Sequence, residues 1–290
     1  MALAVPNFSE GRDTEAIVAA FTTRAELIDR HSDEVHNRSV LTLLAGPEAL
    51  REALVAGARA CIERIDMTEQ SGAHPRIGAL DVCPLVWLAA DVQSTASELA
   101  VEVAIAIGDL GVPVFLYGEL ASRAERRERA FFRQGGLPAL AERMRSGELK
   151  PDFGPPAAHP TAGATLVTAR PPLAAFNVEL DTADAEVARA VAAQLRESGG
   201  GLEGVRAIGI DLDGTAQVST NVHDPIAVSL GAVIEQVRVL AAAHGARPVA
   251  AEVVGLVPAA ALRELPEDVP LRGFDPAKLV IENRLGPREA

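Results

Sequence analysis

The chain has 290 residues, of which 48% are hydrophobic and 23% are charged, a balance typical of a folded globular protein rather than a disordered one. Its formal net charge of −13 argues against nucleic acid or an anionic membrane surface as the main partner, because both are negatively charged themselves. An anionic small molecule could still bind where basic side chains are concentrated locally.

Short apolar runs alternate with longer stretches of helical periodicity in the first half of the chain, which predicts mixed α/β layers. Strands are expected at residues 3–6, 25–29, 39–45, 80–88 and 112–117. Helices are expected at residues 13–20, 46–65 and 94–110, and in two pieces within 122–144. The two pieces should be separated near Gly135 and Gly136, because glycine pairs interrupt helices.

The second half follows a proline- and glycine-rich stretch at residues 146–163, a long loop of a kind that is usually functional or mobile. Residues 165–180 should form one long strand or a strand pair, and Asp213-Gly214 indicates a hairpin between strands at 205–211 and 215–220. Further elements are expected at 181–197 (helix), 225–244 (helix) and 248–254 (strand), followed by two short helices. We therefore expect an α/β (α+β) fold of two packed subdomains, residues 1–178 and 179–290, each a mixed β-sheet with helices on its outer face.

The cysteines and the apolar runs indicate a compartment. Cys61 and Cys83 form neither a metal-binding spacing nor a disulfide framework, which favours a reducing environment. The N-terminus has no basic region followed by an apolar stretch, and the longest apolar run, residues 99–108, is too short to span a bilayer. A cytoplasmic protein is expected.

One segment, residues 65–84, carries a histidine and an arginine close together. Pro75 pushes His74, the residue before it, toward extended geometry, in which side chains two residues apart point the same way. His74 and Arg76 should therefore face one place. A proton carrier beside a fixed positive charge suits a site that binds an anion and moves a proton. The alternative is that His74 is simply solvated or hydrogen-bonded to the backbone.

The same segment contains HPRIGALDV at residues 74–82, which closely resembles the signature HPR(M/I)GA(L/V)DV of the glutamate formimidoyltransferase family. Other stretches resemble family sequences in the same order and with similar spacing: VPNFSEGR at 5–12, HNRSV at 36–40, PDFGP at 151–155, GATLVTARPPLAAFN at 163–177, AQVSTN at 216–221 and VGLVP at 254–258. The resemblance is to the formiminotransferase domain of the formimidoyltransferase-cyclodeaminase proteins. The cyclodeaminase domain of the animal proteins is not expected here, because the sequence ends at Ala290.

The resemblance implies a transferase that moves a formimidoyl group between tetrahydrofolate and L-glutamate, in histidine degradation and one-carbon metabolism. Tetrahydrofolate would be the co-substrate, no metal would be needed, and the protein would be a homodimer with no nucleic-acid or membrane partner. His74 matches the family's catalytic histidine. It would take the proton of the attacking amine and return it to the departing folate nitrogen, N5.

The resemblance also implies residues that bind substrate. Arg76 could hold a carboxylate of glutamate or of the folate tail, because a guanidinium binds carboxylates with two parallel hydrogen bonds; a surface salt bridge is the alternative. Asn37 and Arg38 precede a strand, a common place for ligand-binding groups, although Arg38 could instead tie loops together. Ser9, Glu10 and Arg12 in the opening loop are further candidates.

A proline-rich loop is the expected folate contact. It would offer backbone groups, proline rings and an imidazole to a pterin or benzoyl ring, and it would close over folate in a cleft between the subdomains. Its residues are Gly154, Pro155, Pro156, Ala157, Ala158, His159, Pro160, Thr161, Ala162 and Gly163.

Two departures from the animal enzymes bear on the site. Ala162 stands where those enzymes have a tryptophan, and His31 aligns with an aspartate thought to assist their catalytic histidine. The side chain that orients the catalytic histidine could instead be Asp29, Asp33 or Asp81.

The same region allows two other functions. His31, Asp33 and His36 are metal-ligand types, and with His74 they could build a metal-assisted amidohydrolase, although their spacing matches no standard zinc motif. A non-catalytic folate-binding module is a third reading, supported by the replaced assisting aspartate and opposed by the presence of His74.

Overall fold

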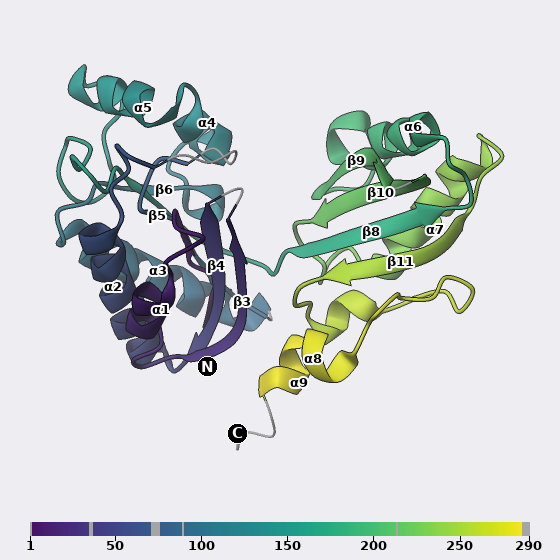
Figure 1. Ribbon diagram of the computed structural model, residues 1–290, viewed down its shortest axis with the longest axis horizontal. Helices are drawn as coiled ribbons and strands as arrows, with labels where there is room; N and C mark the ends of the chain where they lie inside the picture. Colours follow the sequence, from purple (N-terminus) through teal and green to yellow (C-terminus); the bar gives the residue numbers. More distant parts are fainter. Residues whose placement is uncertain (1, 35–36, 71–75, 89, 213, 286–290) are drawn as a thin grey trace. The chain divides into compact units, whose positions relative to one another are not determined.

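The computed structural model describes residues 2–34, 37–70, 76–88, 90–212 and 214–285. The chain divides into two compact units, Met1–Arg170 and Pro171–Ala290 (Figure 1). The division lies ahead of the expected boundary at residue 178, which falls within a strand of the second unit. Pro171 and Pro172 explain the difference, since proline lacks the N–H that a continuous strand would need there.

The first unit is built on a seven-stranded mixed sheet. Its strands are β1 (Ala2–Ala4), β2 (Asn7–Phe8), β3 (Glu26–Asp33), β4 (Arg38–Ala45), β5 (Leu80–Val86), β6 (Val114–Leu116) and β7 (Thr165–Arg170). The path runs β1-β4-β2-β5-β7-β6, and β3 pairs with β4 off this path. The β5–β7–β6 pairings are parallel and the others are antiparallel.

Three helices cover one face of this sheet: α1 (Glu15–Phe21), α2 (Pro47–Arg64) and α3 (Gln93–Gly108) (Figure 1). As expected, α2 has its proline in the first turn. Helices α1 and α2 approach closely at Gly57, where a Cβ atom would lie 2.1 Å from the ring of Phe21. Phe21 in turn stacks on Phe8 of β2, with ring centroids 6.0 Å apart. This helix-covered face holds the larger core of the unit.

The opposite face of the sheet is covered in part by α4 (Arg129–Arg133) and α5 (Gly136–Arg145), which pack on a smaller core around Phe115 and Phe132. The two helices are separated by Gly135 in the left-handed conformation (φ 74°), so the expected break near Gly135 is confirmed. Side chains alternate along a strand, and Leu41, Leu43, Val167 and Ala169 all point into the helix-covered core. Arg38 of β4 and Arg170 of β7 therefore lie on the second face, the side of the sheet on which α4 packs.

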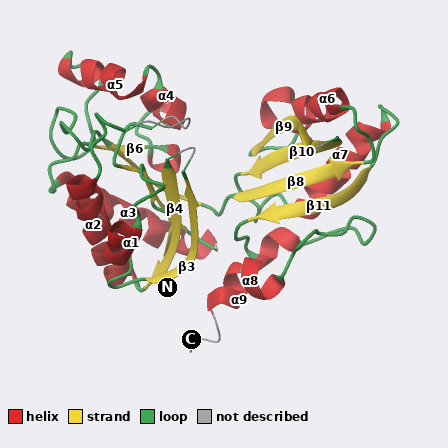
Figure 2. Cartoon of the chain, in the orientation of Figure 1, coloured by secondary structure: helices red, strands yellow, loops and turns green. Residues whose placement is uncertain are grey.

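The second unit is a four-stranded sheet with the order β11-β8-β10-β9. Its elements are β8 (Ala174–Leu180), α6 (Ala185–Leu195), β9 (Val205–Leu212), β10 (Thr215–Val222), α7 (Leu230–Ala242), β11 (Pro248–Val254), α8 (Pro276–Leu279) and α9 (Ile281–Leu285). Figure 2 shows α6 and α7 against this sheet. Helix α6 begins later than expected, because Asp184 accepts a hydrogen bond from Glu186 N (2.9 Å) and caps it.

The expected α/β architecture with two sheet-and-helix subdomains is confirmed, with one correction. The second sheet is antiparallel throughout rather than mixed, because its neighbouring strands all run in opposite directions. The expected hairpin joins β9 to β10, although Asp213 itself lies outside the described residues. Within those described ranges, no helix is both long and apolar enough to cross a membrane.

Candidate active site

Three segments with family-like sequences are tied together at one end of the first sheet. Ser9 donates its hydroxyl to the carbonyl of Gly78 (2.7 Å), and its backbone N–H to the carbonyl of Ala79 (2.9 Å). Gly11 N donates to the side-chain oxygen of Asn37 (2.9 Å). The opening loop, the turn before β4 and the segment before β5 are therefore one hydrogen-bonded frame.

Asn37 is the centre of this frame. It is buried, with 3% of its surface exposed, and its φ of 47° is a left-handed value that asparagine tolerates better than most residues. Its amide nitrogen donates to Gln70, and Gln70 donates to Glu10 (3.3 Å). Both ends of the Asn37 amide are thus engaged by the protein itself.

Arg76 is hydrogen-bonded to the same frame. Its Nη1 donates to the backbone carbonyl of Asn37 (2.7 Å). Its Nη2 is buried and has no hydrogen-bond acceptor among the described residues. Burial lowers the pKa of Arg76, while the nearby carboxylates of Asp81 and Glu10 oppose that effect. One end of the guanidinium is fixed, and the other is removed from water without a partner.

Asp81 holds the segment before β5 in place. Only 2% of its surface is exposed, and its carboxylate accepts the backbone N–H of Ile77 at 2.9 Å. Its other oxygen pairs with Nη2 of Arg133, from α4 on the second face of the sheet, at 2.5 Å. Nε of Arg133 is buried and has no acceptor in the part of the chain that the structure describes. Asp81 was one of the three aspartates considered as the partner that orients His74.

Arg38 lies close to this ion pair. Its guanidinium donates to the side-chain oxygen of Asn7. Burial lowers the pKa of Arg38 to about 10, and the positive charges of Arg133 and Arg129 add to the lowering, whereas Asp81 opposes it. The buried Arg38 is therefore within electrostatic range of a second and a third arginine.

Tyr117 is buried close to the same arginine side chains. Burial raises the pKa of its phenol, and the positive charges of Arg129 and Arg170 beside it oppose that rise. Burial also lowers the pKa of Arg170. We define the arginine cluster as Arg38, Arg76, Arg129, Arg133 and Arg170. In a chain with a net charge of −13, it is a local concentration of positive charge.

The expected folate loop packs against the same segment. Thr161 and Ala162 offer their carbonyls to Met67 N (2.7 Å) and Ala79 N (2.9 Å). The imidazole of His159 folds back on its own loop, where Nδ1 accepts Ala162 N at 3.0 Å and Thr161 N at 3.3 Å. Because Nδ1 is an acceptor, the proton of the neutral ring is on Nε2.

Three of the remaining candidates, Asp29, His31 and Asp33, lie on β3. This strand runs to Asp33, four residues further than expected, because it pairs with β4 along its whole length. His31 is opposite Val40 and Asp33 is opposite Arg38, so both face the side of the sheet that carries Arg38. Asp29 is also on this strand. His36 and His74 lie outside the described residues. Among the residues that are described, no group of three or more His, Cys, Asp or Glu side chains could hold a metal ion.

Sequence reasoning missed Arg129, Arg133, Arg170 and Tyr117 as parts of this region. Two signals were available. Arg170 falls within the family-like stretch 163–177, and residues 123–133 carry five arginines in an acidic protein. Neither signal says which face of the sheet these side chains reach.

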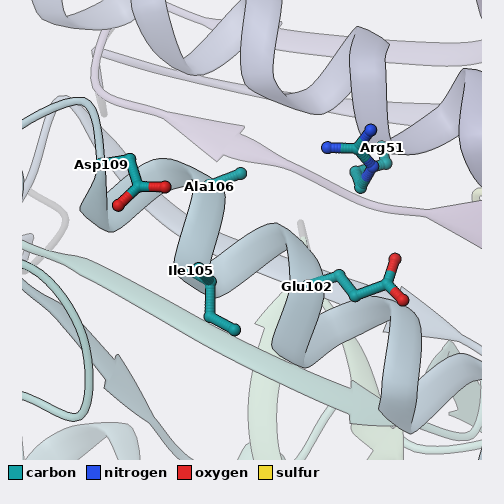
Figure 3. A pocket seen from close by; sticks show the side chains of 5 residues that line it. All are labelled: Arg51, Glu102, Ile105, Ala106 and Asp109. Atoms are coloured by element: carbon teal, nitrogen blue, oxygen red, sulfur yellow. The ribbon is translucent and has the colours of Figure 1, made fainter.

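A separate groove lies between α2 and α3 (Figure 3). Arg51 lines it from α2, and Glu102, Ile105, Ala106 and Asp109 line it from α3 and the residue after that helix. The groove is on the helix-covered side, away from Arg38 and α4, and none of the family-like stretches contributes to it. The arginine cluster and its frame are the stronger candidate site.

Comparison with known proteins gives the same region a family context. Residues 1–170 match the family described as the formiminotransferase domain, N-terminal subdomain, and residues 175–267 match the formiminotransferase domain. The chain is 38% identical to glutamate formimidoyltransferase of Streptococcus pyogenes serotype M1, over 97% of both chains. It is 36% identical to glutamate formimidoyltransferase of Thermoplasma acidophilum, over 95% of this chain and 94% of that one. It is 41% identical to formimidoyltransferase-cyclodeaminase of Sus scrofa, over 89% of this chain but 50% of that protein.

Proposed function

This chain belongs to the formiminotransferase domain family, and from that premise we propose that it is a glutamate formimidoyltransferase. It moves a formimidoyl group between tetrahydrofolate and L-glutamate, a reaction of histidine degradation and one-carbon metabolism. The observation that carries this function is the match, over nearly the full length of both chains, to glutamate formimidoyltransferases of two organisms. Tetrahydrofolate is a co-substrate in this family.

The reaction requires one proton to be removed and one to be supplied. Starting from N-formimidoylglutamate, N5 of tetrahydrofolate attacks the formimidoyl carbon, and N5 loses its proton. A tetrahedral intermediate then breaks the bond between that carbon and the glutamate nitrogen, which leaves with a proton. His74 takes the first proton and returns it to the leaving nitrogen, because an imidazole has a pKa near neutrality. Every step is a transfer of a proton or a formimidoyl group, so no metal is needed in this scheme.

The surroundings of Arg76 suit this chemistry. It follows His74 by two residues, it is fixed by the Asn37 carbonyl, and Asp81 fixes the next residue through Ile77 N. A segment held at these points loses little freedom when substrate binds, which favours a defined reaction geometry. Within the frame, Arg38 and the second N–H and second lone pair of the Asn37 amide bind substrate polar groups, and residues 154–163 bind folate. We also propose that the protein is cytoplasmic and acts as a homodimer.

The test is turnover of N-formimidoylglutamate and tetrahydrofolate by metal-stripped protein. Acid converts the 5-formimidoyl product to the methenyl form, which is followed by its absorbance. Turnover that survives chelation and is lost in His74→Asn, with folate binding retained, is the expected result. Turnover that appears only after a metal is restored would support the amidohydrolase reading instead. Folate binding without turnover in the unaltered protein would leave a binding module.

A further inference from the structure

Helix α4 is too short to be stable alone, and aromatic packing holds it in place. It has five residues, and Phe132, the last but one of them, is fully buried against Phe115, with ring centroids 5.1 Å apart. Phe131 meets the Phe132 ring edge-on at 5.1 Å, and Arg143 of α5 lies 4.4 Å above the Phe131 ring. Arg133, which follows Phe132, is therefore presented from a rigid support.

The guanidinium of Arg133 is only partly used. Asp81 accepts Nη2 of Arg133 on one oxygen and the backbone N–H of Ile77 on the other, so the pair makes one of the two parallel bonds of which an arginine fork is capable. Nε of Arg133 is left buried with no acceptor among the described residues. A buried N–H without an acceptor is unfavourable, which makes it a preferred place for an acceptor on a ligand.

Arg76, next to Ile77 in the chain, also has a guanidinium that is only partly used. Its Nη1 is bound to the Asn37 carbonyl, and its Nη2 is buried without an acceptor in the described part of the chain. Asp81 acts electrostatically on Arg76 and forms an ion pair with Arg133, so both guanidinium groups lie around one carboxylate. Two positive charges with spare N–H groups near one negative charge can be balanced by a second anion of the same kind.

We propose that Arg133 and Arg76 together form a binding site for a substrate carboxylate, in which the carboxylate receives the buried N–H groups that Asp81 leaves without a partner. Guanidinium groups suit this ligand because their flat fork matches the two oxygens of a carboxylate. The inference rests on the proposed function, which supplies two sources of this chemistry. One is the amino-acid substrate, with its glutamate skeleton, and the other is the glutamate tail of folate.

Kinetics separate the two sources. In Arg133→Gln, we expect KM for N-formimidoylglutamate to rise about tenfold or more while KM for tetrahydrofolate stays within about twofold, since a hydrogen bond between charged groups has been lost. A rise confined to KM for tetrahydrofolate, and absent when tetrahydropteroate without a glutamate tail is the substrate, assigns the site to the folate tail. Arg133→Lys should restore less than half of the lost affinity, because lysine keeps the charge but not the fork. Unchanged KM values for both substrates would overturn the proposal.

The matched control is Arg145→Gln on α5. Arg145 is exposed and pairs with Glu142 on its own helix, so its replacement removes the same charge without touching the arginine cluster. Both KM values should be unchanged. Because Arg133→Gln leaves Asp81 buried without its partner, the double variant Asp81→Asn/Arg133→Gln is measured as well. It removes both charges and should show the same loss of substrate affinity.

Binding of glutarate, measured by calorimetry on the full chain, keeps this inference separate from the proposed function. Glutarate has the two carboxylates of glutamate and no amine, so it can bind without any turnover. Binding to the unaltered protein that is lost in Arg133→Gln supports the carboxylate site even if no formimidoyl transfer is found. Equal binding to both proteins would sink it, as would absence of binding combined with unchanged KM values.

Discussion

Gly78 and Gly163 form an antiparallel bridge in which neither residue has room for a side chain. A Cβ atom on Gly78 would lie 1.9 Å from the carbonyl oxygen of Ala164, and one on Gly163 would lie 2.2 Å from that of Ile77. Gly163 also has a positive φ of 69°. The motif glycine thus joins the proposed folate loop to the segment that carries Arg76, and its role is steric.

Gly78→Ala should destabilise the protein by about 1–3 kcal/mol or more, because the added methyl group meets backbone that cannot easily move. Urea unfolding measures this difference. The control is Gly46→Ala, where nothing lies within 4 Å of the new atom and φ is −62°. It should cost less than about 1 kcal/mol, the effect of a poorer helix N-cap. Equal losses in the two variants would contradict the steric role.

Asp81→Asn should lower the free energy of unfolding by about 3–5 kcal/mol, since it leaves the Arg133 guanidinium buried without its countercharge. Adding Arg133→Gln should recover part of that loss, because no uncompensated charge then remains. Asp268→Asn serves as the control: Asp268 pairs with Arg238 at the surface, and its removal should change stability very little. Additive losses in the double variant would show that the two residues are not coupled.

The buried thiols predict a loss of stability at alkaline pH. Burial raises the pKa of Cys83 from 9.0 to about 12, and burial with the nearby Cys83 also raises the pKa of Cys61. Below pH 9 the thiols are neutral in both states, so their contribution is complete. Above it the unfolded chain ionises first, and stability falls as pH rises toward 12, by roughly 1 kcal/mol for Cys83 at pH 10. Between pH 8 and pH 10 the unfolding free energy of Cys83→Ala should fall less than that of the unaltered protein, and identical falls in the two proteins would contradict the assignment.

His159 offers a test of whether its imidazole contacts folate or only shapes the loop. His159→Asn keeps an acceptor that can reach the backbone N–H groups of Thr161 and Ala162, whereas His159→Ala does not. If the ring only shapes the loop, KM for tetrahydrofolate should rise in the alanine variant and stay near normal in the asparagine variant. We expect this outcome, because Nδ1 is already occupied by the loop. A similar rise in both variants would mean that the ring itself binds folate.

Local rules accounted for much of the fold. Pro47 placed the start of α2, the Asp-Gly pair placed the β9–β10 turn, and Gly135 placed the break between α4 and α5. Each is a case in which the covalent structure of one or two residues restricts the backbone. Strand β3 was underestimated, because its outer half is polar and is held by pairing with β4, which periodicity alone does not record.

The candidate site was predicted in part, for a different reason. Family-like stretches gave the residues of the frame, such as Asn37 and Arg76, yet not their hydrogen bonds. The contact between Asp81 and Arg133 joins residues that are 52 positions apart, and it exists only because α4 packs on the second face of the sheet. Sequence shows that residues 123–133 are basic, whereas the direction of each side chain is set by tertiary packing around Phe132.

Strand β5 lies in the interior of its sheet, but one of its two neighbouring strands comes much later in the chain. Its partner on one side is β7. The paired residues Val82 and Leu166 are much further apart in the sequence than residues joined by a turn. During synthesis, β1 to β5 leave the ribosome well before β7. Gly78 and Asp81 are therefore synthesised before their partners Gly163 and Arg133. Closing so long a loop is entropically costly, and parallel pairings of this kind form slowly. A chain released before residue 163 would therefore expose one edge of β5, and that edge would be open to pairing with another molecule.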